Sequence, residues 1–157
     1  MTKLLPNITP EVTKVLFCGL TPDKESLMMQ HHYANPRDKF WRVLHEVAFT
    51  EMQLKTGITQ EARDYNYNYL ISKGIGLTDL GDDITALNNL VKDLKPKVLA
   101  FNGKKAAEVY FGREVELGEQ KEKLGKTRIF VLSSSANSAS ATWNKRHWRE
   151  VSNIIKK

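Results

Sequence analysis

The sequence predicts an α/β fold in which helices cover both faces of a parallel sheet. Short apolar runs alternate along the 157 residues with helix-periodic amphipathic segments, which is the pattern of such a sheet. Three of the apolar runs end in small polar residues: 19–21, 102–103 and 133–135. Ligands of open α/β sheets bind beyond the carboxyl ends of the strands, so we expect these three ends to line one crevice.

The first expected strand is the apolar run over residues 14–18, which stops before Gly19. Residues 19–37 follow as a long loop without periodicity, and loops of that length in compact domains are often functional. Asp38 is a good N-cap for the next helix. The apolar face of that helix comprises Phe40, Leu44, Val47 and Ala48, with Trp41 beside them.

Two helices flank the next expected strand. The first begins after Thr59 and ends near Ser72, and the strand covers residues 75–78. The second helix follows the caps Asp82 and Asp83 and ends before Pro96. Its inner face is predicted to hold Ile84, Leu87, Val91 and Leu94.

The remaining segments complete the alternation. We expect a strand over 97–101, a turn at 102–103 and a helix through Tyr110. Residues 112–126 are charged and punctuated by Gly, which indicates a surface hairpin or loop before a last strand over 127–132. The final helix should bury Trp148, Val151 and Ile155.

Composition favours one domain over residues 1–157, because 41% hydrophobic residues can fill a core of that size. The net charge of +6 makes a polyanionic partner plausible without establishing one. A single cysteine, Cys18, excludes an internal disulfide and a Cys-only metal site, and fits a reducing cytoplasm. The apolar runs are too short to cross a bilayer, and the first residues do not resemble a signal peptide.

Ser133, Ser134 and Ser135 open the last turn between strand and helix. Their hydroxyl and N–H groups could bind a phosphate near a helix N-terminus, or simply cap the loop. Lys145 and Arg146, expected one turn into the final helix, favour a phosphate contact.

An aromatic residue, Tyr33, lies in the long loop beside His31 and His32. Its ring could stack on a planar group, although loop tyrosines more often only pack. Neighbouring residues in an extended segment point in opposite directions, so we do not expect the two histidines to bind a metal.

Four segments, in this order, resemble a known family: VLFCGLTP at 15–22, HHYANPRDKFW at 31–41, GIGLTDL at 74–80 with AFNGK at 100–104, and LSSSANS at 132–138. Each is weak singly, but together they are similar to the uracil-DNA glycosylase superfamily, most closely to its mismatch-specific thymine/uracil members. The resemblance spans about residues 14–150. It implies a three-layer α/β/α sandwich with a mainly parallel sheet of about four strands.

The resemblance also implies a mechanism. Such enzymes flip a nucleotide out of the duplex and cleave its N-glycosidic bond with water, because the bond is inaccessible inside the stack. Tyr33 would stack on the base, Ser133–Ser135 would contact phosphates, and Asn137 would lie where the family inserts a wedge. The pocket would be lined by Gly19, Leu20, Tyr33 and Thr78.

The sequence departs from the family where catalysis is expected. Thr21 replaces the Asn that positions water in the first motif, and Asp38 replaces an Asn of the second motif, which branches acting on deaminated purines use for catalysis. Asp38 is therefore our candidate to activate water or stabilise charge on the sugar, with Thr21 helping to place the water. The plainer interpretation of Asp38 is a helix cap.

These features predict a monofunctional DNA glycosylase of base-excision repair that removes uracil or another deaminated base. We expect a cytoplasmic, nucleoid-associated monomer without cofactor or metal, whose partner is damaged or mismatched duplex DNA or a single strand, and not a membrane. Because Thr21 replaces the usual Asn, a degenerate protein that binds such DNA without releasing a base is an alternative. An α/β enzyme acting on free nucleosides or nucleotides is another.

Overall fold

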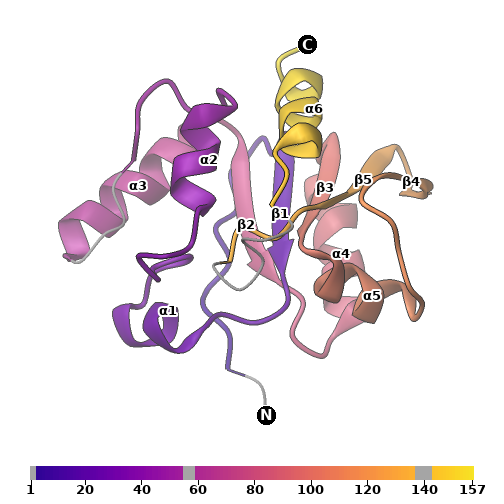
Figure 1. Ribbon diagram of the computed structural model, residues 1–157, viewed down its shortest axis with the longest axis horizontal. Helices are drawn as coiled ribbons and strands as arrows, with labels where there is room; N and C mark the ends of the chain where they lie inside the picture. The colour runs from indigo at the N-terminus through magenta and orange to yellow at the C-terminus, as the bar shows by residue number, and fades with distance from the viewer. Residues whose placement is uncertain (1–2, 55–58, 137–142) are drawn as a thin grey trace.

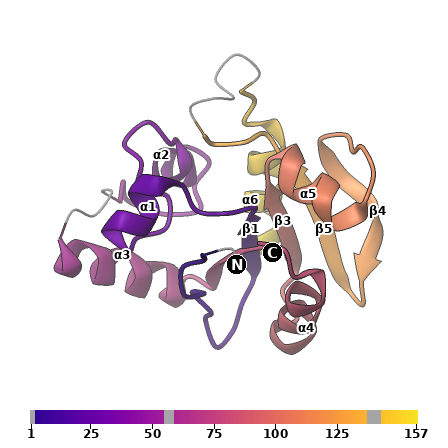
Figure 2. The ribbon, with the colours of Figure 1, turned by 90° about the horizontal axis from the view of Figure 1, so that it is seen from below.

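Five strands form one central sheet in the order β2-β1-β3-β5-β4 (Figures 1 and 2). The computed structural model describes residues 3–54, 59–136 and 143–157. All neighbouring strands run parallel except β4, which is antiparallel to β5. The strands are β1 (Val15–Gly19), β2 (Ile75–Asp79), β3 (Val98–Asn102), β4 (Gly118–Leu124) and β5 (Thr127–Leu132).

The central strand β1 determines where a site can form. Every residue of β1 is buried, and Phe17 pairs with Leu77 of β2 on one side and with Ala100 of β3 on the other. The chain therefore leaves β1 for one edge of the sheet and later returns to its other side. A crevice opens beyond the carboxyl ends of the strands at such a reversal.

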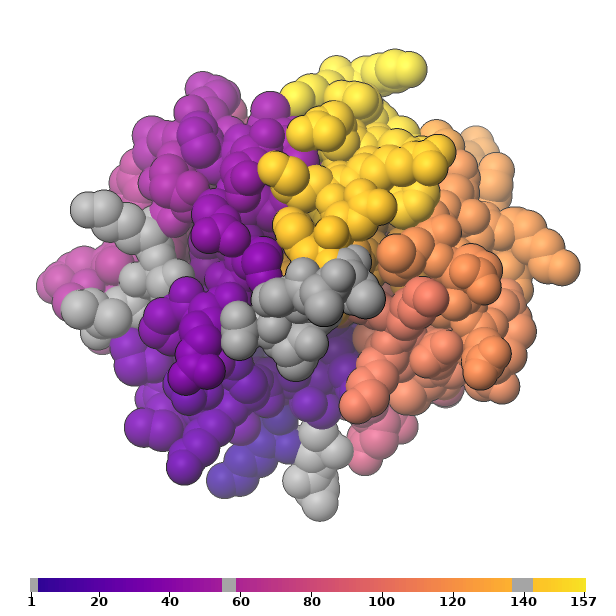
Figure 3. All heavy atoms as spheres, in the orientation of Figure 1, coloured from indigo at the N-terminus to yellow at the C-terminus, as the bar shows by residue number. Residues whose placement is uncertain are grey.

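One face of the sheet is covered by α2 (Phe40–Glu46), α3 (Gln60–Ser72) and α6 (Arg146–Ile155). Their apolar side chains meet around Phe17, whose ring packs edge-on against Phe40 at 5.4 Å between centroids and stacks on Trp148 at 5.5 Å. In the space-filling view, α2 and α6 lie side by side over this face (Figure 3).

The opposite face is covered by α4 (Ile84–Leu94) and α5 (Lys104–Phe111). The alternate residues of the strands point this way, among them Leu16, Cys18 and Phe101, so the sheet lies between two apolar layers. The fold is thus the predicted α/β sandwich. Within the described residues, no helix is long and apolar enough to span a membrane.

Two predicted helices begin at the expected caps. The Thr59 hydroxyl accepts a hydrogen bond from the N–H of Ala62, and the Asp83 carboxylate accepts one from Ala86, so α3 and α4 start where the sequence places them. Gly74 follows the C-cap residue of α3, Lys73, so the helix ends where the sequence predicts.

The expected loop over 19–37 contains a short helix, α1 (Lys24–Met29), so that prediction is wrong in part. Asp23 caps α1 by accepting a hydrogen bond from the N–H of Ser26 at 2.9 Å. Met28 is 71% exposed, and only Ser26 in α1 is buried. A helix with no apolar face leaves no periodic signal in the sequence.

Two other boundaries differ from the prediction. The helix after Asp38 ends at Glu46, and Ala48 adopts a left-handed conformation with φ of 63°. The segment 112–126, predicted as a surface hairpin or loop, contains β4, which forms a hairpin with β5 and adds a fifth strand to the four expected. Its outer residues are charged and alternate between exposed and half-buried because β4 is an edge of the sheet.

Candidate active site

A pocket of about 480 Å³ lies at the carboxyl ends of the strands. The three segments expected to meet do so: residues 19–21 at the end of β1, 102–103 at the end of β3 and 134–135 after β5 all line it. The connection between α1 and α2 closes the remaining side with His32, Tyr33 and Asp38. The reversal of chain order at β1 therefore brings together residues that lie more than 100 positions apart in the sequence.

Most predicted catalytic and base-pocket residues line this pocket. They are Gly19, Leu20, Thr21, Tyr33 and Asp38, and the predicted phosphate contacts Ser134 and Ser135 join them. Thr21 is exposed at the pocket, whereas Gly19 and Ser135 are buried.

Asp38 is held in place from two directions. Its Oδ1 accepts hydrogen bonds from the Ser135 hydroxyl at 2.6 Å and from the N–H of Phe40 at 2.9 Å. The side chain of Asn102 in turn donates to the Ser135 hydroxyl at 2.8 Å, and its oxygen accepts from the N–H of Ser135 at 2.9 Å. A series of hydrogen bonds thus links β3, the segment after β5 and the start of α2, and it fixes this carboxylate.

The surroundings of the Asp38 carboxylate suit it to accept a proton. Burial raises the pKa of the Asp38 carboxyl, and the hydrogen bonds from Ser135 and Phe40 oppose that increase. A carboxylate of raised pKa binds a proton more readily than an exposed one while its hydrogen bonds still favour the ionised form. Helix α2 has Lys39 as its N-cap residue, so Asp38 lies one residue before the cap and reaches Phe40 from there.

Tyr33 occupies a strained position against the core. Its φ is 54°, and its ring stacks on Phe40 with centroids 3.9 Å apart. One ring face is therefore covered by Phe40. The Tyr33 hydroxyl is buried and has no hydrogen-bond partner among the described residues. Such conformations persist where the surrounding structure enforces them, often at binding sites.

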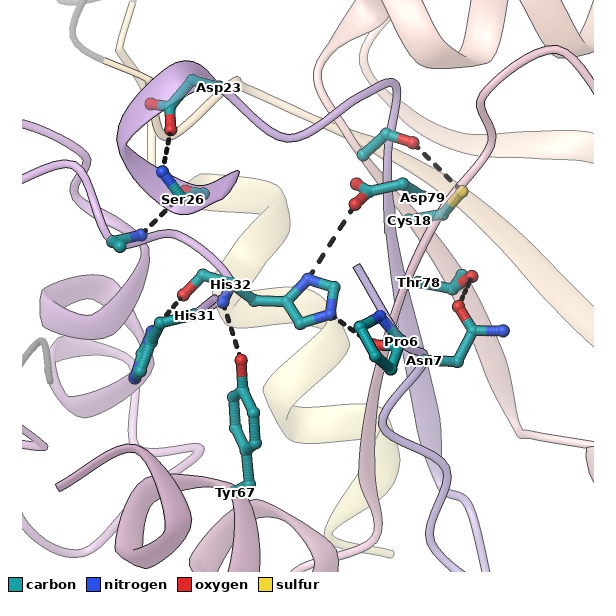
Figure 4. Close-up of polar contacts among 12 residues, drawn as sticks. Pro6, Asn7, Cys18, Asp23, Ser26, His31, His32, Tyr67, Thr78 and Asp79 are labelled. Carbon is teal, nitrogen blue, oxygen red and sulfur yellow. Dashed lines mark hydrogen bonds and ion pairs between the residues drawn. The ribbon is translucent and has the colours of Figure 1, made fainter. Parts of the chain in front are cut away.

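Asp79, the last residue of β2, is a pocket residue that our sequence reasoning missed. Its side chain is only 6% exposed, and burial raises its pKa from 3.8 to about 6. The sequence prediction chose Thr78, its neighbour, which does not line the pocket and donates a hydrogen bond to Asn7 instead (Figure 4). Successive residues of a strand point to opposite sides of the sheet, so Thr78 and Asp79 cannot both face the pocket. This alternation was the sequence signal that could have identified Asp79.

His31 and His32 have structural partners. The Nδ1 of His31 donates to the carbonyl of His32 at 2.7 Å, and the Nε2 of His32 donates to the carbonyl of Pro6 at 2.8 Å. Burial lowers the pKa of both rings. In the part of the chain that the structure describes, no group of three or more His, Cys, Asp or Glu residues is placed to hold a metal.

The other predicted DNA contacts lie away from the pocket or outside the described residues. Ser133 is buried, and its hydroxyl accepts from the N–H of Asn144. Lys145 forms an ion pair with Glu46 at 2.9 Å and precedes α6, so neither it nor Arg146 lies one turn into that helix. Asn137 is outside the described residues.

Two exposed lysines at the pocket were not predicted. Lys104 and Lys105 form the first turn of α5 and line the pocket beside Ser134. The preceding Gly103 has φ of 109°, and a Cβ there would approach the Ser134 Cβ to 3.1 Å. The tight contact brings the N-terminus of α5 close to the segment after β5. Their position directly after the turn that ends a strand was the sequence signal that could have identified these two lysines.

Comparison with known proteins agrees with the fold. The sequence model of the Uracil DNA glycosylase superfamily matches residues 6–155. The fold is similar to the solution NMR structure of a Methanosarcina acetivorans protein that has been proposed to be a uracil DNA glycosylase. The two chains share 23% sequence identity with a TM-score of 0.68, and the match covers 98% of this chain and 97% of the other.

Proposed function

This chain belongs to the uracil DNA glycosylase superfamily, and we propose from this that it is a monofunctional DNA glycosylase for uracil or another deaminated base. The observation that carries the proposal is Asp38, a carboxylate fixed at the pocket by Ser135 and the N–H of Phe40. Family members act on DNA, and the net charge of +6 suits a polyanion.

The pocket residues can divide the chemistry among them. Hydrolysis of an N-glycosidic bond builds positive charge on the sugar, which a fixed carboxylate stabilises, and it needs a water that the same carboxylate can deprotonate. Asp38 serves these two roles, and the exposed hydroxyl of Thr21 helps to orient the water. Tyr33, supported on one ring face by Phe40, offers its other face to the flipped base.

Lys104 and Lys105 are placed to bind the DNA backbone. Both side chains are exposed at the pocket, and they belong to the first turn of α5, where free N–H groups also favour an anion. A nucleotide whose base enters the pocket would bring its flanking phosphates to this rim.

A panel of oligonucleotides tests the function. Each duplex carries one uracil, hypoxanthine or xanthine, or a G·T mismatch, and is treated with excess protein and then alkali, which cleaves the strand at an abasic site. We expect strand cleavage at one or more deaminated bases and none at normal pairs. No cleavage of any member, in duplex or single strand, contradicts the proposal.

One observation favours a second function, a binding protein that does not cut. Thr21 is neutral and a weak base where the family motif has Asn, so the loop after β1 lacks its usual water-positioning side chain. This alternative predicts that the protein binds a G·U duplex in single-turnover conditions without releasing uracil.

The substitution Thr21→Asn separates a weakened enzyme from a non-enzyme. If the loop is a weakened form of the family's site, restoring the amide should increase uracil release by about tenfold or more, because it orients the attacking water. The measurement is the single-turnover rate on the G·U duplex, with Thr21→Val as the matched variant without a polar group. Equal rates for both variants would contradict a role for position 21 in placing water.

A further inference from the structure

We propose that the edge of the sheet opposite the pocket binds the backbone of a second segment of duplex DNA while the pocket holds the damaged nucleotide. The inference goes beyond the proposed function, because it concerns a separate surface and not the release of a base. It rests on the proposed function only in taking the pocket at the carboxyl ends of the strands to be the place where the first segment binds.

Lysines mark the amino ends of the parallel strands. Because β1, β2, β3 and β5 run parallel, their amino ends share the edge of the sheet that lies away from the pocket. A lysine directly precedes three of these strands: Lys14 before β1, Lys97 before β3 and Lys126 before β5. The topology that assembles the pocket at one edge therefore gathers positive charge at the other.

Hydrogen bonds bring several of these lysines side by side. The main-chain N–H of Lys97 donates to the carbonyl of Lys14 at 2.9 Å, so the starts of β3 and β1 adjoin. The Nζ of Lys97 donates to the main-chain oxygen of Lys157 at 2.6 Å. The C-terminal end of α6 therefore lies at the same edge of the sheet (Figure 1).

A groove of about 770 Å³ lies at this edge, between the end of α4 and the turn from β4 to β5. Lys92 and Lys95 line it from the side of α4, and Lys126 lines it from the turn. The Thr127 hydroxyl donates to the carbonyl of Pro96 at 2.6 Å, which fixes the turn against the start of β3. Among the described residues no acidic side chain lines the groove, so a row of phosphates laid in it would meet positive charge from both walls.

Six exposed lysines make up this surface, and we call them the amino-edge lysines: Lys14, Lys92, Lys95, Lys97, Lys126 and Lys157. Within the described parts of the chain, none of them forms an ion pair with an Asp or Glu side chain. Two carboxylates of the neighbouring strand β4 pair with arginines instead, Glu119 with Arg128 and Glu122 with Arg113. Asp93, in the last turn of α4, does not line the groove. The charge of this surface is therefore left for a partner.

The chemistry of the surface suits a DNA backbone. A lysine ammonium is a compact point charge that binds phosphate without a fixed geometry, and phosphate contacts carry no sequence information. The amino-edge lysines are spread over strand starts, a hairpin turn and two helix ends, which matches an extended polyanion better than a small anion. A duplex carries one charge for about every 1.7 Å of its axis, a density that the carboxylates of a protein segment do not reach.

Two segments are needed because the two edges face away from each other. Duplex DNA is stiff over roughly 150 base pairs, so one short duplex cannot follow the surface from the pocket to the amino-edge lysines. A molecule whose pocket is occupied therefore still presents these lysines to another stretch of DNA. Holding both segments would let the protein pass from one to the other without dissociating.

Capture of a second duplex tests the proposal. A short duplex with one 2′-fluoroarabino-uracil, which cannot be hydrolysed, is immobilised and loaded with wild-type protein at low salt. A fluorescent undamaged duplex of the same length is then added. We expect the loaded surface to retain the fluorescent duplex and the immobilised DNA alone to retain none.

Two matched double variants locate the second contact. Lys95→Gln with Lys126→Gln removes two charges from the groove, so capture should weaken about tenfold and its salt slope should decrease by about 1 to 2. Lys104→Gln with Lys105→Gln removes the same charge at the pocket. This second variant should bind the immobilised duplex less tightly, while the molecules that remain on it capture the fluorescent duplex as wild type does.

The proposal is overturned if wild type loaded on the first duplex captures no second one, or if the two double variants capture it equally well. Tighter capture of fluorescent polyglutamate than of DNA at equal total charge would also overturn it, in favour of an acidic protein. Failure of the proposed function looks different. In that case, damaged oligonucleotides lose no base, while the undamaged duplex still binds and Lys95→Gln with Lys126→Gln still weakens that binding.

Discussion

At the scale of single residues, two carboxylates line the pocket in different surroundings, the half-buried Asp38 and Asp79, whose side chain is 6% exposed. Asp38 receives hydrogen bonds from Ser135 and Phe40, whereas Asp79 Oδ2 has no partner among the described residues. Environments that differ in this way give two groups of the same type separate roles. We propose that the fixed carboxylate acts on the sugar and on the attacking water.

The substitution Ser135→Ala should impair catalysis without changing base preference. It removes a hydrogen bond to the Asp38 carboxylate, which is worth a factor of roughly 10 to 100 in rate for a charged acceptor. That hydrogen bond also lowers the pKa of Asp38, so its loss raises the pKa. Activity that needs ionised Asp38 should then decline at a higher pH than in wild type.

Single-turnover rates between pH 4 and 8 measure both effects of Ser135→Ala. The matched control is Ser134→Ala. The Ser134 hydroxyl accepts from the N–H of Ala136, so its loss leaves the hydrogen bonds from Ser135 and Phe40 to Asp38 in place. Identical pH profiles for the two variants would show that Ser135 does not act through Asp38.

At the scale of elements, the sequence predicted those helices and strands that leave a periodic or local pattern. The three central strands and the caps of α3 and α4 agree with the prediction because apolar runs and cap residues are local signals. The helix α1 was not predicted, because it exposes Met28 and has no apolar face. For the edge strand β4, the prediction left a hairpin or a loop open, because the residues of β4 are mostly charged and only its pairing with β5 shows the strand.

The first turn of α5 should supply part of the affinity for DNA. Replacing Lys104 and Lys105 by Gln removes two exposed positive charges beside the pocket. Each lost phosphate contact reduces the slope of log affinity against log salt by about 0.9, so the slope should decrease by about 1 to 2. The measurement is anisotropy of a G·U duplex in increasing KCl.

A double substitution elsewhere controls for net charge. Lys121 and Lys123 lie on the edge strand β4 and do not line the pocket, so replacing them by Gln removes the same charge at another place. Equal salt slopes for the two double variants would refute a phosphate contact at α5.

At the scale of the whole molecule, the sheet order brings the site together. Residues 19–21, 102–103 and 134–135 meet because β1, β3 and β5 are adjacent and parallel, so their carboxyl ends share one edge. The sequence allowed this meeting to be predicted from strand ends alone. The unsatisfied oxygen of Asp79 could not be predicted, because it depends on which neighbours fail to reach it in three dimensions.

The buried charge of Asp79 should reduce the stability of the fold near neutral pH. Its folded-state pKa is raised to about 6, so folding favours the protonated form. The associated stability is fully present below the unfolded pKa and is lost as the pH rises through the folded pKa. A shift of this size corresponds to about 3 kcal/mol.

The permanently neutral variant Asp79→Asn should therefore be more stable than wild type at pH 7.5, by up to about 3 kcal/mol. The difference should shrink toward zero below pH 4. Urea unfolding at several pH values measures it. If wild type is at least as stable as the variant at pH 7.5, the carboxylate has a stabilising partner that our account of Asp79 does not include.

The central claim is that Asp38 makes this chain a DNA glycosylase, and one rate tests it most directly. Single-turnover base release should be measured for wild type, Asp38→Ala and Asp38→Asn on whichever damaged duplex wild type cleaves best. Loss of the carboxylate should slow release by about 10²- to 10⁴-fold in Asp38→Ala. The amide in Asp38→Asn can still accept from Ser135 and Phe40, so that variant isolates the charge. Near-normal release by Asp38→Ala would contradict the account.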